Sequence, residues 1–230
     1  MYEAVHAHPD GRATVARLAK RAATYGYGGI VVRNHGGEAA TYDRGRLVET
    51  YGIDLVPGIE IRVEEPGRAS GLIGNYRSKR TIVCVHGGDL NRFAVEQPQV
   101  DVLAHPMEDG DVNHVLAKTA AENGVHFEFN FGRVLRAEGG DRVQAIQGLR
   151  KLREMVTQYD APYVVSADAG SHLALRAPRE LLAVGEAIGL DREMIEAGLT
   201  AWREIAERNR DRQSDSVIEP GVRIESDEGD

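Results

Sequence analysis

The chain has 230 residues, of which 42% are hydrophobic and 28% charged, and its formal net charge is −8. This composition supports one sizeable core, and no apolar run is long enough to cross a bilayer, which excludes a membrane-spanning protein and argues against a membrane partner. The first residues lack the basic and apolar segments of a secretion signal, and Cys84 is the only cysteine, so we expect a cytoplasmic protein without disulfides.

Short apolar runs alternate with amphipathic segments along residues 1–210. The apolar runs predict strands over residues 2–7, 29–33, 55–63, 80–86, 101–104, 125–130 and 162–167. The amphipathic segments predict helices over residues 14–25, 42–51, 91–96, 111–123, 140–159, 179–188 and 192–209. This alternation indicates parallel strands, and about seven of them favour an α/β, TIM-barrel-like fold with surrounding helices. The alternative is an open doubly wound sheet, but no glycine-rich dinucleotide loop follows the first strand.

The negative charge is concentrated after the last predicted helix. Residues 211–230 hold seven acidic residues and two arginines, which leaves a net charge of only −3 on residues 1–210. We therefore expect one TIM-barrel-like domain over residues 1–210 and an acidic disordered tail over residues 211–230. Only four of the 28 basic residues are lysine, and this arginine-heavy, acidic composition is typical of a protein that works in concentrated salt. There, an RNA partner would be held by direct arginine contacts rather than by a basic field.

Histidines and carboxylates accumulate at the ends of the predicted strands. They are His8, His35, His86 and His105 after strands, Glu60 and Glu128 on strands, and Asp168 after the seventh strand. In a barrel these strand ends converge on one mouth. His6 and His8 are two residues apart, so in an extended strand both side chains face the same way. Imidazoles and carboxylates gathered in this manner would suit Zn²⁺, Mn²⁺ or Fe²⁺.

The motifs His6-Ala7-His8, Gly58-Ile59-Glu60, His86 and Ala104-His105-Pro106 resemble the polymerase and histidinol phosphatase (PHP) superfamily of metal-dependent phosphoesterases. The resemblance implies a distorted barrel with up to three metal ions, Zn²⁺ or Mn²⁺. Its implied ligands are His6, His8, Glu60, His86, His105 and Asp168. The closing Asp-x-His element of that superfamily is changed here, because three residues separate Asp168 from His172. A stand-alone phosphoesterase with a bound hydroxide nucleophile is one functional hypothesis, and a barrel that kept the histidines without the metals is the other.

A second resemblance extends over roughly residues 1–210. It rests on the segments 91–96, 100–106, 113–118, 125–130, 149–152, 164–168 and 175–181, among them Asn91-Arg92-Phe93 and Leu175-Arg176-Ala177-Pro178. Taken in order, these segments resemble the family of archaeal ribonuclease P protein component 3, which has a eukaryotic counterpart in the same enzyme. That family has a barrel related to the PHP fold, so the two resemblances share an ancestry and differ in activity.

The second resemblance implies a subunit of ribonuclease P (EC 3.1.26.5) that carries no catalytic residue and binds no cofactor of its own. In that enzyme the RNA subunit, with Mg²⁺, removes the 5′ leader of precursor tRNA by endonucleolytic hydrolysis. The implied partners are the ribonuclease P RNA, precursor tRNA as the substrate of the complex, and the small protein component 2. Components 2 and 3 form a heterotetramer with two copies of each, which acts on the catalytic domain of the RNA.

Basic residues near predicted loops and helix ends are the candidates for RNA contact. They are Arg77, Lys79, Arg80, Arg92, Arg176 and Arg179. Arginine suits this role because its planar fork binds phosphate oxygens bidentately. We favour Arg92 and Arg176, which lie inside the matching segments. The alternative is that these side chains are solvated or pair with neighbouring acids such as Glu96 and Glu180.

Overall fold

Seven parallel strands lie side by side in the order in which they occur in the chain. The computed structural model describes residues 1–214, 217–219 and 222–223. The strands are β1 (Tyr2–Val5), β2 (Gly29–Val32), β3 (Asp54–Ile61), β4 (Ile82–His86), β5 (Val102–Ala104), β6 (His126–Asn130) and β7 (Tyr163–Ser166). A parallel bridge between Val5 and Ala169 brings the two edges of the sheet together. The sheet is therefore a nearly closed barrel, which confirms the predicted TIM-barrel-like α/β fold.

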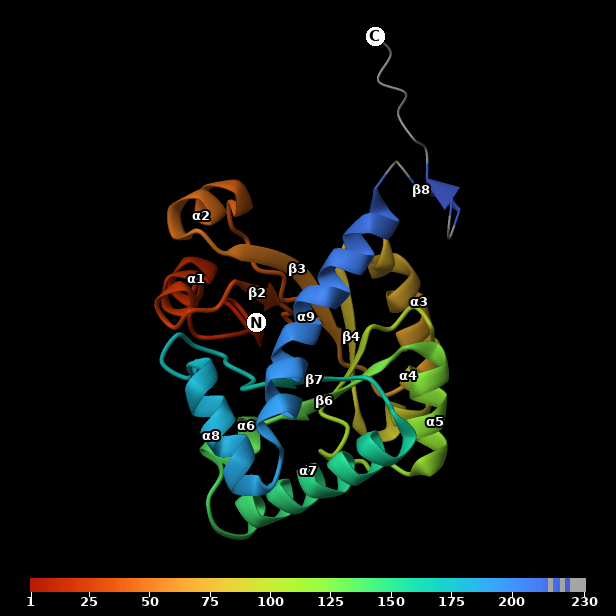
Figure 1. Cartoon of the computed structure of the whole chain (residues 1–230). Coiled ribbons are helices and arrows are strands. Elements are labelled where there is room, and N and C mark those ends of the chain that lie inside the picture. Colours follow the sequence, from red (N-terminus) through yellow and green to blue (C-terminus); the bar gives the residue numbers. More distant parts are fainter. Residues whose placement is uncertain (215–216, 220–221, 224–230) are drawn as a thin grey trace.

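Helices surround the strands (Figure 1). They are α1 (Val15–Thr24), α2 (Arg44–Tyr51), α3 (Pro66–Arg77), α4 (Asn91–Val95), α5 (His114–Asn123), α6 (Gly132–Arg136), α7 (Gly139–Tyr159), α8 (Pro178–Ile188) and α9 (Arg192–Gln213), with a 3₁₀ turn at Gly88–Leu90 before α4. None of the helices in the described part of the chain is long and apolar enough to cross a membrane.

Two of these helices were not predicted from the sequence. Helix α3 contains three glycines and buries only Ala69 and Ile73, so it presents no apolar stripe that periodicity could detect. Pro66 at its first turn is the one local start signal. Helix α6 has only five residues. Both helices are stabilised by their place against the barrel rather than by an amphipathic pattern.

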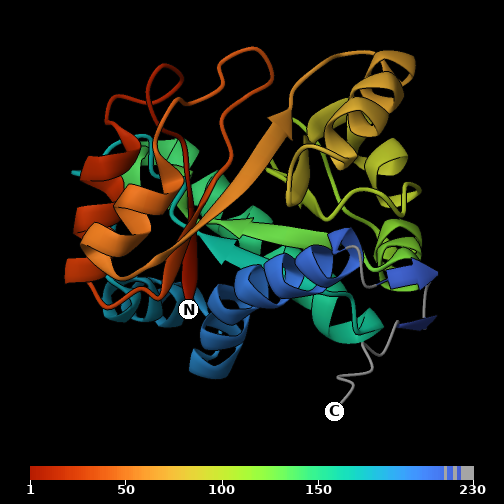
Figure 2. The same cartoon turned by 90° about the horizontal axis from the view of Figure 1, so that it is seen from above.

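The inside of the barrel is apolar along most of its length, and α9 closes one end of it. Alternate strand residues face inward and form one buried cluster that includes Ala4, Val31, Cys84 and Val164. Trp202 and Ile205 of α9 belong to the same cluster. Figure 2 shows the loops that follow the first strands on one side of the molecule and α9 on the opposite side. We call the carboxyl ends of the strands the mouth and the end that α9 covers the base.

The predicted boundary between barrel and tail requires a correction. Helix α9 continues through Gln213, so residues 211–213 are helical rather than part of a disordered tail. The side chain of Gln213 donates hydrogen bonds to the carbonyl oxygens of Arg77 and Arg80, at 3.2 and 3.1 Å, which fixes this last turn on the base. The strands β8 (Val217–Glu219) and β9 (Val222–Arg223) then pair in antiparallel fashion. The remaining residues of the predicted tail, 215–216, 220–221 and 224–230, lie outside the described part of the chain.

Candidate functional site

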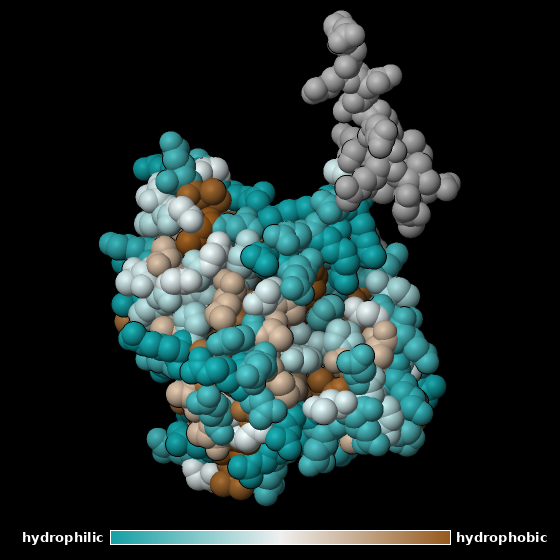
Figure 3. Space-filling view, in the orientation of Figure 1, coloured by the Kyte–Doolittle hydropathy of each residue, from teal (hydrophilic) through white to brown (hydrophobic). Residues whose placement is uncertain are grey.

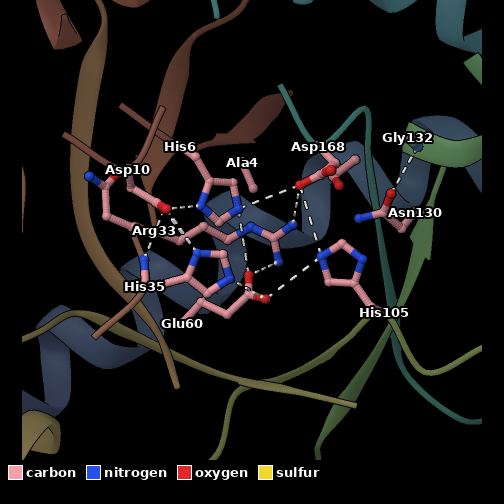
Figure 4. A network of polar contacts seen from close by, with 12 residues as sticks. Ala4, His6, Asp10, Arg33, His35, Glu60, His105, Asn130, Gly132 and Asp168 are labelled. Atoms are coloured by element: carbon pink, nitrogen blue, oxygen red, sulfur yellow. Dashed lines mark hydrogen bonds and ion pairs between the residues drawn. The ribbon is translucent and has the colours of Figure 1, made fainter. Parts of the chain in front are cut away.

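A layer of polar side chains lies above the apolar interior, at the mouth of the barrel. Its members come from successive strands or from the residues directly after them. They are His6, Arg33, Glu60, His86, His105, Glu128 and Asp168. Figure 4 shows how several of these side chains converge from different elements. The sequence pattern of histidines and carboxylates at strand ends thus predicted a real cluster.

Arg33 lies at the centre of this layer, and the sequence analysis did not identify it. Its side chain is fully buried, with Nη1 3.2 Å from Glu60 Oε2 and Nη2 2.5 Å from Glu128 Oε1. Asp168 Oδ1 lies 3.8 Å from the same Nη2. Burial alone would lower the pKa of Arg33, but the carboxylates of Glu128 and Glu60 raise it well above its usual value. The guanidinium is therefore a permanent cation that neutralises buried carboxylates, which could not remain charged without it.

Glu128 is held by several donors in addition to Arg33. Its Oε1 accepts a hydrogen bond from the Ser166 hydroxyl at 2.6 Å, and its Oε2 accepts one from the His105 backbone N–H at 3.1 Å. The Asn130 side chain donates to Oε2 at 3.1 Å. Each oxygen of this fully buried carboxylate therefore has a partner, as a buried charge requires.

Four histidines surround the other buried carboxylate of this layer, Glu60, and His6 Nε2 lies 3.6 Å from its Oε2. Its Oε1 lies 2.7 Å from His86 Nδ1, 3.4 Å from His35 Nε2 and 3.7 Å from His105 Nε2. Burial would raise the pKa of Glu60, but Arg33 and then the histidines lower it well below its usual value. Burial would also lower the pKa of His105, yet Glu108, Glu60 and Glu128 together raise it to about 9. The mouth therefore keeps charged groups of both signs in close contact.

Asp10 joins the cluster from the turn after β1. It lies 2.7 Å from His6 Nδ1 and 3.0 Å from His35 Nδ1, and it accepts the His35 backbone N–H at 3.0 Å. Burial would lower the pKa of His6, but hydrogen bonds to Asp10 and Asp168 raise it to about 9. The turn closes tightly at Gly11, where a Cβ atom would lie 2.0 Å from the carbonyl oxygen of His6. A glycine directly after an aspartate near the His6 motif is the signal that could have found Asp10.

The structure corrects the expected position of His8. Strand β1 ends at Val5, and the chain then turns through residues 8–13, so His6 and His8 do not share one face of a strand. The His8 side chain is exposed, and its backbone N–H donates to the Ala13 carbonyl at 2.8 Å. In contrast, His35 and Glu128, which the strand-end pattern identified, lie in the mouth.

The ligand set implied by the PHP resemblance is not assembled as a whole. His8 is outside, Arg33 lies between Glu60 and Asp168, and Asp168 is bound at 2.7 Å by Arg136. Two overlapping groups, each with ligand atoms within 4.8 Å of one another, remain in the described residues: His6, Asp10 and His35, and His35, Glu60 and His86. Glu60 Oε2 and His35 Nε2 are buried without a hydrogen-bond partner. The imidazole and carboxylate donors fit a single divalent cation at His35, Glu60 and His86, and they do not fit a three-metal centre.

A cavity of about 550 Å³ opens above this layer. Besides members of the polar layer, its walls contain Arg12, Arg62, Glu108, Arg133, Arg136 and Ser171. Arg136 donates to the Ala167 carbonyl at 2.9 Å as well as to Asp168, so it is part of the wall. The sequence analysis missed these arginines because they lie on loops and on α6, outside any motif.

The six residues predicted to contact RNA lie at three separate places. Arg77, Lys79 and Arg80 are at the base, before β4. Arg92 is the second residue of α4, and Arg176 and Arg179 flank the start of α8. Arg77 is bound internally, with Nη1 2.6 Å from Asp101 Oδ2 and Nη2 donating to the Thr81 carbonyl at 2.6 Å. This arrangement gives Arg77 a structural role.

The other five differ in exposure. Lys79 and Arg179 are exposed, whereas Arg80 and Arg176 are half-buried. Arg176 uses Nη1 to donate to the Leu173 carbonyl at 3.2 Å. The Arg92 side chain is 83% exposed and pairs with Glu96 at 2.9 Å. Pairing with Glu96 is the alternative to RNA contact that the sequence analysis gave for Arg92. Because this ion pair is exposed to solvent, the guanidinium remains accessible to a phosphate.

Comparisons with known proteins agree on one family. The family model described as RNase P subunit p30 matches residues 1–214. Ribonuclease P protein component 3 of Natronomonas pharaonis is 71% identical over 230 residues, which cover 100% of this chain and 98% of that one.

Two solved structures share the fold. A chain of the cryo-EM structure of archaeal ribonuclease P with mature tRNA has a TM-score of 0.83 at 23% identity, with 100% of both chains covered. Histidinol phosphate phosphatase of Lactococcus lactis, complexed with zinc, L-histidinol and phosphate, has a TM-score of 0.59 at 11% identity, with 82% of this chain and 94% of that chain covered. At these identities the two structures show the barrel fold alone.

Proposed function

Since this chain belongs to the RNase P subunit p30 family, we propose that it is a protein subunit of ribonuclease P that assists the RNA subunit in removing the 5′ leader of precursor tRNA. The observation that carries this proposal is the 71% identity, over the whole chain, with a ribonuclease P protein component 3. The chain also covers 98% of that relative, so the likeness is not confined to a shared barrel.

In this proposal the RNA subunit and its Mg²⁺ perform the hydrolysis, and the protein supplies no catalytic group. The position of Arg33 supports this division, because a fixed guanidinium already neutralises Glu60 and Glu128, two of the carboxylates available at the mouth. We further propose that the subunit works in the cytoplasm beside the small protein component 2, with two copies of each. Among the predicted RNA contacts, Arg92, Lys79 and Arg179 have exposed side chains and are the residues we retain for this role.

A PHP-type phosphoesterase is the second candidate function, and one observation favours it. His35, Glu60 and His86 place ligand atoms within 4.8 Å of one another. A divalent cation bound there would supply a hydroxide nucleophile and polarise a phosphoryl oxygen. Of the chain's own residues, Asp10 would orient His35, and Arg33 would hold Glu60 in its charged state.

Reconstitution separates the two candidates. Ribonuclease P RNA is assayed for 5′-leader cleavage of a precursor tRNA at limiting Mg²⁺, with and without this protein and its small partner. We expect the protein to lower the Mg²⁺ requirement, and we expect His8→Ala to behave as wild type because His8 lies outside the mouth. If the protein has no effect on cleavage but hydrolyses a generic phosphoester with Zn²⁺ or Mn²⁺, and Glu60→Gln abolishes that turnover, the phosphoesterase function replaces the subunit function.

A further inference from the structure

Three arginines on the wall of the mouth cavity have unused hydrogen-bond donors. Arg12 lies in the turn after β1, Arg62 follows β3, and Arg133 belongs to α6, so three separate elements bring them to one cavity of about 550 Å³. Within the described residues none of the three guanidinium groups takes part in a hydrogen bond or an ion pair. Arg12 and Arg62 are exposed, and Arg133 is half-buried.

The acidic groups of the same cavity are, in contrast, already bound. Asp10 is in contact with His6 and His35, at 2.7 and 3.0 Å. Asp168 is bound by Arg136 at 2.7 Å, and Glu108 lies 3.2 Å from His105 Nδ1. Beneath them, Arg33 offsets Glu60 and Glu128. Free positive charge therefore remains in the cavity without a matching free negative charge, in a chain whose net charge is −8.

This imbalance points to an anion as the missing partner. A phosphate group suits three guanidinium forks better than a carboxylate does, because it offers more oxygens for bidentate hydrogen bonds. The Ser171 hydroxyl also lines the cavity and can donate to a phosphate oxygen. The three arginines come from two loops and from α6, and two of them are exposed, an arrangement that lets a phosphodiester chain cross the cavity instead of enclosing a small anion.

We propose that the mouth cavity binds a phosphate of an RNA strand through Arg12, Arg62 and Arg133. This inference rests on the proposed function and gives it a place on the molecule that none of the sequence-predicted RNA contacts occupies. In this proposal arginines, rather than a metal ion, hold the phosphate. In concentrated salt such direct contacts retain more of their strength than a diffuse basic field does.

The test compares two triple variants that change the net charge equally. The mouth variant combines Arg12→Gln, Arg62→Gln and Arg133→Gln. The control variant combines Arg17→Gln, Arg46→Gln and Arg68→Gln, which replace exposed arginines on α1, α2 and α3. Binding of a fluorescent single-stranded RNA oligonucleotide is measured by anisotropy at several salt concentrations. We expect the mouth variant to lose about tenfold or more in affinity and to reduce the slope of log Kd against log salt by about one for each arginine that contacts a phosphate.

The control variant is expected to retain nearly all of the affinity and the slope. Equal losses in the two triple variants would show that only net charge matters and would overturn the proposal. Inorganic phosphate and adenosine monophosphate serve as competitors: if they bind wild type but not the mouth variant, while RNA binds both equally, the site takes a free phosphate and the RNA assignment is wrong. Circular dichroism and thermal unfolding verify that both variants are folded.

Reconstituted ribonuclease P distinguishes a failure of this site from a failure of the proposed function. If wild type stimulates leader cleavage and the mouth variant stimulates it equally at limiting protein, the function stands and the mouth proposal fails. If wild type itself gives no stimulation, the proposed function fails. A mouth variant that needs about tenfold more protein for the same stimulation supports both.

Discussion

The two ends of the barrel use the same residue types in opposite ways. At the base, the buried carboxylate of Asp101 is bound by Arg77 at 2.6 Å, by Asn209 at 2.8 Å and by the Val83 backbone N–H at 2.8 Å. At the mouth, three arginines make no hydrogen bond or ion pair in the described residues. Of the seven buried side-chain atoms that lack a hydrogen bond in that part of the chain, four belong to Arg33, His35 and Glu60, whereas Arg80 Nε is the one at the base. A network whose donors are all used contributes to stability, whereas one with unused donors is available for a ligand.

Helix α9 is the reason for this difference. It lies across the base, where its Arg208 and Arg210 reach Asp101 and Asp54, at 3.2 and 2.7 Å. Figure 3, in the same orientation as Figure 1, shows that the face carrying α9 is mostly hydrophilic, with separate hydrophobic spots rather than one patch. No helix of comparable length covers the mouth in the described structure, so the carboxyl ends of the strands remain open.

The largest expected effect is at the centre of the mouth. Arg33→Met removes the cation between Glu60 and Glu128, which leaves buried Glu128 without its ion pair and Glu60 with histidines alone, so we expect a loss of about 3–5 kcal/mol in the free energy of unfolding. Urea denaturation of the variant and of wild type measures this difference in the free energy of unfolding. Adding Glu128→Gln to this variant should recover part of the loss, because it removes one uncompensated charge. A loss below about 1 kcal/mol would mean that the mouth carboxylates do not depend on Arg33.

A somewhat smaller effect is expected at the base. Asp101→Asn removes the charge that Arg77 and Arg208 bind, and we expect a loss of about 2–3 kcal/mol because both arginines are partly exposed and can be rehydrated. Asp111→Asn is the matched control, since the pair of Asp111 with Lys151 is on the surface and should contribute less than about 1 kcal/mol. Asp101→Asn should leave RNA binding at the mouth unchanged. Weaker RNA binding in this variant would show that the two ends are coupled.

Changes in pH should affect the two ends with opposite sign. Burial, and then Arg208, lowers the pKa of His126 at the base to about 4, so an unfolded chain takes up this proton first and stability is lost as pH falls from about 6.5 toward 4. At the mouth the pKa values of His6 and His105 are about 9, so their contribution is complete below about pH 6.5 and is lost as pH rises toward 9.

Thermal unfolding as a function of pH measures the loss of stability toward low pH (the acid branch) and the loss toward high pH (the alkaline branch). His126→Gln should flatten the acid branch between about pH 6.5 and 5, by at most about 1.4 kcal/mol for each pH unit, and should leave the alkaline branch as in wild type. The carboxylates of Asp10 and Asp168, whose pKa values folding lowers, lose their contribution only when the pH falls toward the unfolded-chain value of about 4. Burial raises the pKa of Glu3 to about 8, so Glu3 acts with the opposite sign in this window, but it does so equally in both proteins and cancels in the difference between His126→Gln and wild type. An unchanged acid branch in His126→Gln would contradict the assignment.

The smallest effect on stability is expected for an arginine with unused donors. Arg133→Gln breaks no hydrogen bond or ion pair in the described structure, so the free energy of unfolding should stay within about 0.5 kcal/mol of wild type. Arg77→Gln, at the base, should be clearly destabilising by the same urea assay, because its guanidinium binds Asp101 and the Thr81 carbonyl. Similar free energies of unfolding for the two variants would contradict the distinction between arginines with unused donors at the mouth and bound arginines at the base.

The sequence predicted the barrel better than its mouth. The strands were predictable because buried parallel strands are continuous apolar runs, as in the segment 82–85 of β4, where all four residues are buried. The position of Glu60 followed directly from its strand. The turn after β1 was not predictable in this way, because a period of two residues holds only while the chain is extended, and β1 ends before His6.

Arg33 shows a second limit of sequence reasoning. An arginine after a strand is ordinarily expected to face solvent, and only the tertiary arrangement of Glu60 and Glu128 on other strands makes its burial favourable. Arg77 is the converse case: its position in a basic segment suggested an RNA contact, while the buried Asp101, distant in sequence, binds it internally. Both roles depend on charges contributed by other elements.

Trp202 of α9 is a natural fluorescent probe that lies inside the barrel, beneath the polar layer of the mouth. It is the chain's one tryptophan, its ring is fully buried, and its Nε1 donates to the Val165 carbonyl at 2.9 Å. The guanidinium carbon of Arg33 lies 5.8 Å from the ring centroid, a cation–π distance. Any ligand that shifts the charge balance above Arg33 acts on the electric field felt by this indole. Its fluorescence can therefore follow occupancy of the cavity in the unlabelled protein.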